Sequence, residues 1–372
     1  MSEYNGTLYL DGEGKDILYP ATKTSQVFDD DGNSLNSTLT NMQSAIENMG
    51  TTGIRANKIT EISFNEAPTT CISTADSSAN QYDNYQFSFF NVLKISDSRY
   101  FLYYTCFGQN DDTSRSSYKH LALAYSSDGT TWTRGIPSGI TAPVSGTNLI
   151  FRNSVFEHHV FKVLDPSYPY RLICNYGVGK RDRIRLYKSA DAVNFQLVRD
   201  VIMGDYDSQM TAIDKGGLIK VYLRLRTASG SSIRGNRQIG FFYMDYDGEL
   251  IAPPTLAFDA ESLYNASAMP LDSTRDILFP THYDADADTQ NLTCYIVADN
   301  GVTKVAIDTS KIISSNYQTF YVSPRGIVDI GGSQYIFYMA RTTQHDTTGG
   351  ASYILKAKIK YTTVGIPLNE SN

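Results

Sequence analysis

The sequence contains little tryptophan, cysteine and histidine, and it has no excess of positive charge. Of its 372 residues, 1 is Trp, 4 are Cys and 5 are His. The 32 Lys and Arg residues are outnumbered by 39 Asp and Glu residues, which gives a net charge of -7 and a pI near 5.3. An acidic chain without a run of basic residues lacks the electrostatic footprint of a nucleic-acid-binding protein. Nucleic acid is therefore excluded as a main partner.

The four cysteines lack the close spacing of a metal site or a redox pair. They are Cys71, Cys106, Cys174 and Cys294, and no two of them form a CxxC motif. Three of them fall in apolar strand-like stretches, which predicts buried free thiols that pack as small hydrophobic groups. Such thiols fit assembly in a reducing cytoplasm. We expect no metal and no cofactor.

Long apolar runs are also missing. No stretch reaches the roughly 18 apolar residues that a membrane-spanning helix needs. The first residues, MSEYNGTLYLDGEGKD, have neither the basic start nor the apolar core of a secretion signal. We expect a chain that is neither exported by that route nor inserted in a membrane.

Aromatic residues are abundant, with 27 Tyr and 17 Phe, and they recur in one short phrase. In this phrase a turn rich in Asp, Ser or Gly leads into a strand of aromatic and aliphatic residues. The five copies are SDSRYFLYYTCF from Ser96, DPSYPYRLICNY from Asp165, DKGGLIKVYLRL from Asp214, DSTRDILFPTHY from Asp272 and GGSQYIFYMART from Gly331. Their spacing of about 60 residues suits propeller blades, which take about 40–50 residues plus loops. The sequence thus predicts an all-β protein with a five-bladed β-propeller over residues 54–362.

Residues 1–50 differ from this pattern, because they end in a helical one. Leu35, Leu39, Met42, Ile46 and Met49 are spaced as the apolar seam of a short coiled coil. A helix of this length is marginal alone. It either associates with other copies, which we expect to be a homotrimer, or lies on the propeller. Residues 363–372 are predicted to be a polar tail.

The stretch ILYPATKTSQVFDDDGNSL before this helix resembles the virion-proximal anchor of tail-fibre and baseplate-attached proteins of bacterial viruses. The matching residues are Tyr19, Pro20, Thr22, Val27, Asp29, Asp30, Gly32 and Leu35. The resemblance implies a bacteriophage tail fibre or receptor-binding protein, made in the bacterial cytoplasm and located in the virion tail. It implies that residues 1–50 attach the protein to other tail proteins.

Two turns support the blade pattern. Ser126-Ser127-Asp128-Gly129-Thr130-Thr131-Trp132 aligns with Ser189-Ala190-Asp191-Ala192-Val193-Asn194-Phe195, keeping Ser, Asp and the aromatic residue in register. We expect the Asp to accept backbone N–H bonds and the aromatic ring to pack between blades. FYMDYDGELIAPP, from Phe242, is a degenerate third copy.

These turns, together with the repeated phrase, resemble the five-bladed propeller clan of glycoside hydrolases, which includes arabinanases, β-xylosidases, invertases and levansucrases. The resemblance implies three carboxylates at the starts of the inner strands of the first three blades. Here the acids at those starts are Asp83, Glu157 and Asp207. The clan's order of Asp, Asp and Glu is changed to Asp, Glu and Asp, and its local phrases around the second and third acids are absent. A methylene shift can cost about 100-fold in rate, so hydrolysis and simple binding both stay open.

Glycan binding at the same end of the blades does not require carboxyl groups with matched pKa values. Carbohydrates are bound by aromatic faces and by hydrogen bonds from charged side chains. The predicted ligand-binding residues are Tyr82, Tyr85, His158, Arg224, Arg237, Tyr264, His282, Arg325 and His345.

An apparent calcium motif is set aside. Asp284, Asp286 and Asp288 are spaced like the start of a calcium loop, but Thr289 stands where that loop needs Gly and Tyr295 where it needs Glu. A solvated hairpin tip is the better interpretation.

Three functions follow from these features. The first, which we prefer, is a tail protein that recognises a host cell-surface glycan, with trimers gaining avidity for a polysaccharide. The second is a glycoside hydrolase that depolymerises that glycan with Asp83, Glu157 and Asp207. The third is a structural spacer of the virion tail.

Overall fold

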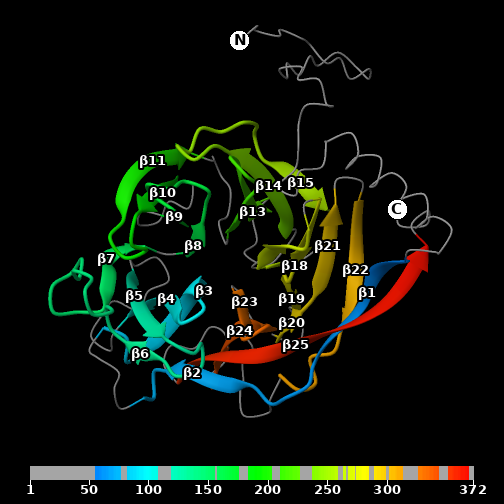
Figure 1. Ribbon diagram of the computed structural model, residues 1–372, viewed down its shortest axis with the longest axis horizontal. Coiled ribbons are helices and arrows are strands. Elements are labelled where there is room, and N and C mark those ends of the chain that lie inside the picture. The colour runs from blue at the N-terminus through cyan, green and yellow to red at the C-terminus, as the bar shows by residue number, and fades with distance from the viewer. Residues whose placement is uncertain are drawn as a thin grey trace, which may run out of the picture. The chain divides into compact units, whose positions relative to one another are not determined.

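The structure is a computed structural model in which the described residues form an all-β fold without a helix (Figure 1). The described residues are 55–76, 82–107, 119–155, 157–175, 183–202, 210–226, 237–258, 263–264, 267–272, 274–284, 289–298, 301–312, 326–342 and 351–367. By their contacts the residues divide into two compact units, residues 1–58 with 363–372 and residues 59–362. The predicted N-terminal helix lies outside the described residues. The fold below is that of the second unit, and only β1 and β25 extend beyond its bounds.

Most strands of the described chain belong to series in which consecutive strands pair antiparallel, as in a propeller blade. The first series is β3 (Gln86–Ser96), β4 (Arg99–Phe107), β5 (Lys119–Ser126) and β6 (Thr133–Arg134), with β7 (Leu149–Val155) also on β5. The second is β8 (His158–Lys162), β9 (Tyr170–Asn175), β10 (Arg183–Ser189) and β11 (Gln196–Ile202). The third is β12 (Thr211–Asp214), β13 (Ile219–Arg226), β14 (Arg237–Met244) and β15 (Thr255–Phe258).

Two further series are joined into one sheet. The fourth is β17 (Ala268–Pro270), β18 (Arg275–Leu278), β21 (Cys294–Ala298) and β22 (Gly301–Ile307), and the fifth is β23 (Ile327–Ile330), β24 (Ser333–Arg341), β25 (Ser352–Pro367) and β2 (Thr69–Ser73). Strand β1 (Arg55–Phe64) lies between β22 and β25 and runs parallel to β22. The fifth series thus combines β2 from the start of the unit with strands from its end.

A small sheet outside these series was not expected from the sequence. It contains β16 (Leu263–Tyr264), β19 (Thr281–Asp284) and β20 (Thr289–Leu292). It arises because the fourth repeated phrase does not form one strand: β18 ends at Leu278, and β19 begins after Pro280. Proline lacks the N–H that a central strand needs. The other four phrases contain β4, β9, β13 and β24 as single strands.

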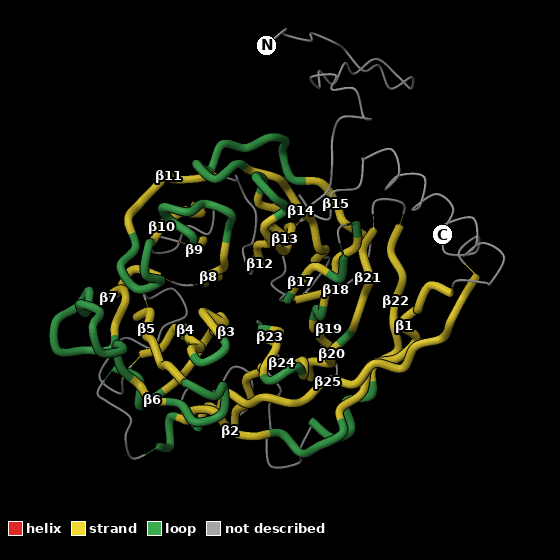
Figure 2. The backbone as a smooth tube through the Cα atoms, in the orientation of Figure 1, coloured by secondary structure: helices red, strands yellow, loops and turns green. Residues whose placement is uncertain are grey.

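The first strands of the series are neighbours around a common centre. Strand β3 contacts both β23 and β8, and β12 contacts both β8 and β17. Figure 2 shows the labels of these strands nearest the middle of the ring of sheets. The sequence prediction of an all-β propeller-like fold is confirmed. The number of blades stays a prediction, because β1 merges two series and the small sheet stands apart from all of them.

Because neighbouring strands of a series run in opposite directions, the connections between strands lie alternately at two ends of the sheet. At the hairpin end, the first strand turns into the second through short connections such as residues 97–98 in the first series and 331–332 in the fifth. At the strand-start end, the first strand begins, the second strand ends and the third strand begins, as at Phe107 and Lys119 in the first series. The two ends carry different polar side chains, and this difference positions the candidate site.

Aromatic side chains fill the space between the series. Tyr103 and Tyr104 are fully buried on β4, yet they belong to different apolar clusters because neighbouring strand residues point to opposite faces. Tyr103 donates a hydrogen bond to the Ala192 carbonyl of the second series at 2.7 Å. On the other face, Tyr104 packs in a cluster that includes Phe337 of the fifth series. Buried tyrosines therefore connect adjacent series.

The cysteines are free, as predicted. Cys106, Cys174 and Cys294 are buried and Cys71 is half-buried. Burial raises the pKa of the Cys71, Cys174 and Cys294 thiols to about 12, so they stay protonated and unreactive at neutral pH.

The Ser-x-Asp turns have the predicted structure. Asp128 accepts hydrogen bonds from the backbone N–H groups of Thr130 and Thr131, both at 2.7 Å. Asp191 accepts in the same way from Val193 and Asn194, at 2.9 and 2.7 Å. The next residue is left-handed in both copies, with φ of 67° at Gly129 and 64° at Ala192. The shared backbone confirms the alignment of the two turns.

The aromatic residue of the first turn packs between series, also as predicted. Trp132 lies edge-on to Phe337 of β24, with ring centroids 6.1 Å apart. The third copy keeps the left-handed residue but not the aromatic one: Gly248 follows Asp247 with φ 79°, and Asp245 accepts the Asp247 N–H at 2.9 Å as Ser126 accepts the Asp128 N–H in the first copy. No helix in the described ranges is long and apolar enough to cross a membrane.

Candidate functional site

The predicted site residues fall into three groups. Asp207, Arg325 and His345 lie outside the described residues. Arg237 in β14, Tyr264 in β16 and His282 in β19 are placed by their strands alone. The side chains described in the structure are those of Tyr82, Asp83, Tyr85, Glu157, His158 and Arg224. Every role predicted for these residues stays a prediction.

Glu157 and His158 occupy the beginning of the inner strand of the second series. Glu157 is 1 % exposed and directly precedes β8, and His158, its first residue, is fully buried. The Glu157 carbonyl accepts the N–H of Asn175 at 2.9 Å, and His158 pairs with Cys174 in the ladder of β8 and β9. The ladder therefore fixes the backbone of both residues at the strand-start end. A buried carboxyl and a buried imidazole are side chains with acid–base and hydrogen-bonding chemistry.

Side-chain hydrogen bonds connect β8, the inner strand of the second series, to the inner strands on either side of it, β3 and β12. On β3, the Asn91 amide donates to the Val160 carbonyl at 2.9 Å and accepts the Val160 N–H at 3.1 Å. On the other side, His159 Nδ1 accepts the Ala212 N–H of β12 at 2.9 Å. The His159 ring also stacks on Phe161, with centroids 5.6 Å apart. These contacts make the starts of the inner strands a preorganised frame.

Arg224 brings a buried cation to the same end of the third series. It is 2 % exposed and lies on β13 two residues before the end of that strand at Arg226. In the ladder it pairs with Ile239, and Tyr222, two residues earlier, pairs with Thr211 at the start of β12. Arg224 thus lies beyond the beginning of the inner strand, in the direction of the strand-start end.

Asp83, the first predicted acid, is held in a buried network. Its carboxylate accepts the Tyr104 hydroxyl at 2.5 Å and Arg134 Nη1 at 3.1 Å, and both members of the ion pair are at most 5 % exposed. Burial, and then the negative charge of Asp83, raises the pKa of Tyr104, so the phenol stays a neutral donor. Arg134 also donates to the Ser73 carbonyl on β2. Asp83 therefore connects the first series to the strand that completes the fifth.

Tyr82 lies beside His120 and Arg152. Its ring is edge-on to His120 at 5.6 Å, and the Arg152 guanidinium lies over it at 5.2 Å and donates to its hydroxyl at 3.3 Å. Strands β5 and β7 carry these two residues, at the outer part of the first series. Tyr85 is half-buried just before β3. The predicted aromatic residues near β3 therefore include one that faces outer strands.

Four polar residues that lie at the start of β3 or contact it were not among the predicted site residues: Gln86, Ser88, Lys119 and Arg341. Gln86 presents its amide oxygen to Arg341 Nη1 and Nη2 at 2.8 and 3.0 Å. Lys119 Nζ donates to the Ser88 hydroxyl. Arg341 ends β24 and Lys119 begins β5, so both stand at strand boundaries of the strand-start end. A charged residue at such a boundary is the sequence signal that could have identified them.

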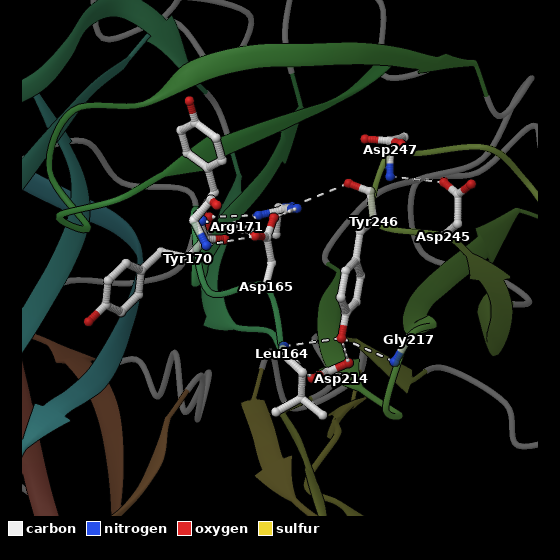
Figure 3. A network of polar contacts seen from close by, with 11 residues as sticks. Leu164, Asp165, Tyr170, Arg171, Asp214, Gly217, Asp245, Tyr246 and Asp247 are labelled. Carbon is white, nitrogen blue, oxygen red and sulfur yellow. Dashed lines mark hydrogen bonds and ion pairs between the residues drawn. The ribbon is translucent and has the colours of Figure 1, made fainter. Parts of the chain in front are cut away.

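The hairpin end holds a different kind of polar network, shown in Figure 3. Arg171 is 2 % exposed and pairs with Asp165 at 2.9 Å. Its Nε donates to the Tyr246 carbonyl at 3.3 Å. The Tyr246 hydroxyl donates to Asp214 at 2.7 Å and accepts the N–H of Gly217 at 3.1 Å. Turns of the second and third series are thereby joined.

A second hairpin-end network connects the third and fourth series. Asp276, on β18, is 1 % exposed and accepts hydrogen bonds from Lys215 at 2.6 Å, Lys220 at 3.1 Å and the Tyr222 hydroxyl at 2.7 Å. Lys220 Nζ also lies 4.8 Å from the ring centroids of Tyr222 and Phe241. The groups satisfy one another within the fold, which indicates a structural role.

The comparisons with known proteins concern the fold. No family model matches the chain, and no curated protein matches its sequence. Solved structures do resemble it. A family 117 glycoside hydrolase from Zobellia galactanivorans aligns with a TM-score of 0.54 and 12% identity, over 81% of this chain and 90% of its own. An N-acetylgalactosamine deacetylase from F. plautii, solved with blood group B trisaccharide, aligns with a TM-score of 0.52 and 13% identity, over 80% and 95%.

A glycosyl hydrolase from Bacteroides ovatus gives a TM-score of 0.52 at 11% identity, over 80% of this chain and 94% of its own. At such identities the likeness shows the fold alone. The chain therefore has the β-propeller fold of glycoside hydrolases and related sugar-active enzymes.

Proposed function

We propose that this protein is a receptor-binding component of a bacteriophage tail whose propeller recognises a glycan on the host surface. The observation that carries the proposal is that Glu157, His158 and Arg224 are buried at the strand-start ends of two neighbouring series, on backbone that the strand ladders fix. Binding sites of this kind combine apolar walls with a few positioned polar groups. The fold is one that sugar-active proteins use.

The tail assignment is supported by the sequence alone. Residues 1–50 contain the segment that resembles a virion anchor and the apolar seam that predicts a trimer. A trimer would present three propellers to one polysaccharide, so weak sites would bind with avidity. Light scattering should give a trimeric mass for the full chain and a monomeric mass for Leu39→Asp, which places a charge in the seam. A monomeric mass for the unaltered chain would contradict this part of the proposal.

A glycoside hydrolase is the second candidate, because Glu157 is a buried carboxyl at the start of an inner strand. Hydrolysis needs two carboxyl groups about 5–10 Å apart across the glycosidic bond. Asp83 is less suited to be the second, since Tyr104 and Arg134 engage its two oxygens. A carboxylate in a buried ion pair is costly to free from its partner.

One experiment separates the functions. The protein is incubated with capsular polysaccharide from a susceptible host, and the polymer is analysed by size-exclusion chromatography. Co-elution of full-length polymer with protein is the expected result, and Glu157→Gln should weaken it. The control is Asp97→Asn, which alters an acid whose side chain is 98% exposed at the hairpin end.

If the unaltered protein shortens the polymer and Glu157→Gln does not, the function is hydrolysis rather than binding alone. Absence of any interaction with glycans of susceptible hosts would contradict both and leave the structural spacer.

A further inference from the structure

Arg152 is held against the ring of Tyr82 on the strand that leads into the second series. Arg152 lies on β7, and its guanidinium is 5.2 Å from the centroid of the Tyr82 ring. Its Nη2 also donates a hydrogen bond to the Tyr82 hydroxyl at 3.3 Å. A guanidinium is attracted to the face of an aromatic ring. Tyr82 therefore contacts Arg152 through both its ring and its hydroxyl, which favours one orientation of the long side chain.

The Tyr82 ring is itself positioned by the fold. It packs edge-on against His120 of β5, which is 2% exposed, with ring centroids 5.6 Å apart. The next residue in sequence, Asp83, is fully buried, and its carboxylate accepts two hydrogen bonds. Because these two neighbours of Tyr82 are buried, the support for Arg152 is in place before a ligand binds. Such preorganisation lowers the cost of binding.

Arg152 uses little of its hydrogen-bonding capacity within the described part of the fold. A guanidinium carries five N–H donors in one plane, and the bond to Tyr82 is the one that Arg152 donates to a described residue. Arg152 is exposed and forms no ion pair with any residue that the structure describes. Other arginines of the described chain do pair with an Asp or Glu: Arg134, Arg171, Arg185, Arg199 and Arg275. Arg152 thus differs from them in having an aromatic partner and, among the described residues, no acidic one.

The position of Arg152 places it on the side of the predicted site. Strand β7 runs antiparallel to β5 and ends at Val155, opposite Lys119, the first residue of β5. Arg152 therefore lies toward the strand-start end of the first series. Glu157 follows it by five residues, and a chain of five residues spans at most about 18 Å. One polysaccharide chain can therefore reach both Arg152 and the start of β8.

A guanidinium oriented in this way suits one class of ligand. Its planar set of donors matches the oxygens of a carboxylate or a sulfate, and it can bind two of them at once. We propose that Arg152, oriented by Tyr82, is an anion subsite on the strand-start side of the first series and that the recognised glycan is acidic, carrying carboxylate or sulfate groups. The inference rests on the proposed glycan-binding function and specifies its substrate class. Because Arg152 is exposed, solvent screens its charge, and we expect a modest effect on affinity that nevertheless selects acidic glycans.

Model polymers that differ only in charge test this inference. Dextran sulfate and uncharged dextran share a backbone and differ in sulfate; polygalacturonate and its methyl ester share a backbone and differ in carboxylate. Affinity of the full-length protein for each polymer, and for the host polysaccharide, is measured by biolayer interferometry at low and at physiological salt. The expected result is binding to at least one acidic polymer about 5-fold tighter than to its uncharged counterpart, with a preference that salt weakens. The pair that shows the preference identifies sulfate or carboxylate as the recognised group.

Substitutions then assign the preference to Arg152. Arg152→Met should lower the affinity for the acidic polymer by about 5-fold and leave the affinity for the uncharged one unchanged. Arg152→Lys keeps the charge but loses the planar set of donors, so it should lose most of the preference. Arg99→Met is the matched control, because Arg99 is also exposed and forms no ion pair with a described residue, but begins β4 at the hairpin end. Its preference for the acidic polymer should equal that of the unaltered protein.

Two variants of the supporting ring test the role of Tyr82. Tyr82→Leu removes the ring and should reduce the preference about as much as Arg152→Met, whereas Tyr82→Phe keeps the ring and should reduce it less. Each variant is first shown to unfold at the temperature of the unaltered protein, so that a lost preference is not a loss of folding.

Three outcomes would overturn the anion subsite: equal binding of acidic and uncharged polymers, a preference that Arg152→Met leaves intact, or a loss with Arg99→Met as large as with Arg152→Met. If one of these occurs while the host polysaccharide binds, the inference fails and the proposed function stands. If the host polysaccharide does not bind either, both fail.

Discussion

Arg171 and Arg224 are two of the buried arginines of the propeller unit, and they lie at opposite ends of their series. Arg171 is held at the hairpin end by Asp165 and by the Tyr246 carbonyl, so its charge is used within the fold. Arg224 lies near the end of β13, on the strand-start side of the third series, and Glu157 and His158 lie at the start of β8 in the second series. Polar contacts join neighbouring series at both ends, and the starts of the inner strands carry the additional buried side chains of Glu157 and His158.

The largest expected effect concerns the hairpin end. Asp276→Asn removes the charge that pairs with Lys215 and Lys220. Breaking a buried pair costs about 3–5 kcal/mol, so we expect a loss of that size in the free energy of unfolding by chemical denaturation. Asp272→Asn is the control, because its partner Arg275 and Asp272 itself are 42% and 37% exposed. A loss below about 1 kcal/mol, as for an exposed pair, would remove the structural role of this network.

The next effect tests the turns that pack against the neighbouring series. A Cβ at Gly129 would lie 2.6 Å from Ile330 Cδ1, and the backbone there has φ of 67°. The left-handed conformation alone costs a side-chain-bearing residue about 1–2 kcal/mol, so Gly129→Ala should destabilise by at least that amount in thermal or chemical unfolding. Stability unchanged within about 0.5 kcal/mol would show that the turn can move away from β23 freely.

Tyr246→Phe examines the network of Figure 3 without altering the packing of the ring. The substitution removes a hydroxyl that donates a hydrogen bond to Asp214 and accepts the N–H groups of Leu164 and Gly217. Hydrogen bonds at such a half-buried position contribute about 0.5–1.5 kcal/mol each, so we expect a lower denaturation midpoint. Glycan affinity should be unchanged, since the network lies at the hairpin end. A loss of affinity in protein that is still folded would show that the two ends are coupled.

Ala192→Gly should have a smaller effect of the opposite sign. Ala192 has φ of 64° at the position where the first turn has Gly129. Relief of the left-handed backbone should stabilise the fold by up to about 1 kcal/mol, offset in part by the greater freedom of glycine in the unfolded chain. The melting temperature checks this. A decrease larger than about 1 kcal/mol in stability would show that the Ala192 methyl group packs more favourably than the strain costs.

The smallest effect is a pH dependence. Burial opposes ionisation of Asp128, but hydrogen bonds from Thr131, Thr130 and Ser126 outweigh it and lower its pKa to about 2. A lowered pKa gives stability that is present above the unfolded value near 4 and is lost as the pH falls toward the folded value. Asp128→Asn should therefore flatten the stability curve between about pH 4 and 2. An identical slope in both proteins would contradict the assignment.

The sequence predicted those features that depend on local patterns. Four repeated phrases became single strands, and the Asp128 and Asp191 turns formed as expected because their side chains bond to nearby backbone. The merging of two series by β1 was missed, since a parallel pair of strands far apart in sequence leaves no local signal. Pro280 indicates a break between β18 and β19, because proline cannot donate a ladder hydrogen bond. The repeated phrase around it nevertheless led to the prediction of one continuous strand.

The candidate site was predicted in part for the same reason. Glu157 and His158 could be assigned to the start of an inner strand by counting strands. The ion pair of Asp83 with Arg134, 51 residues later, depends on how the outer strands meet and could not be derived from spacing. The contacts that Lys119 and Arg341 make with β3 likewise depend on which strands the fold brings together.

The most direct test of the central claim compares Glu157→Gln with Tyr246→Phe in both stability and binding to the host polysaccharide. If the strand-start end binds the glycan and the hairpin end stabilises the fold, Glu157→Gln will lose at least 10-fold in affinity and Tyr246→Phe will lose stability with its affinity intact. Unchanged affinity in Glu157→Gln, together with a loss of affinity in folded Tyr246→Phe, would contradict the account.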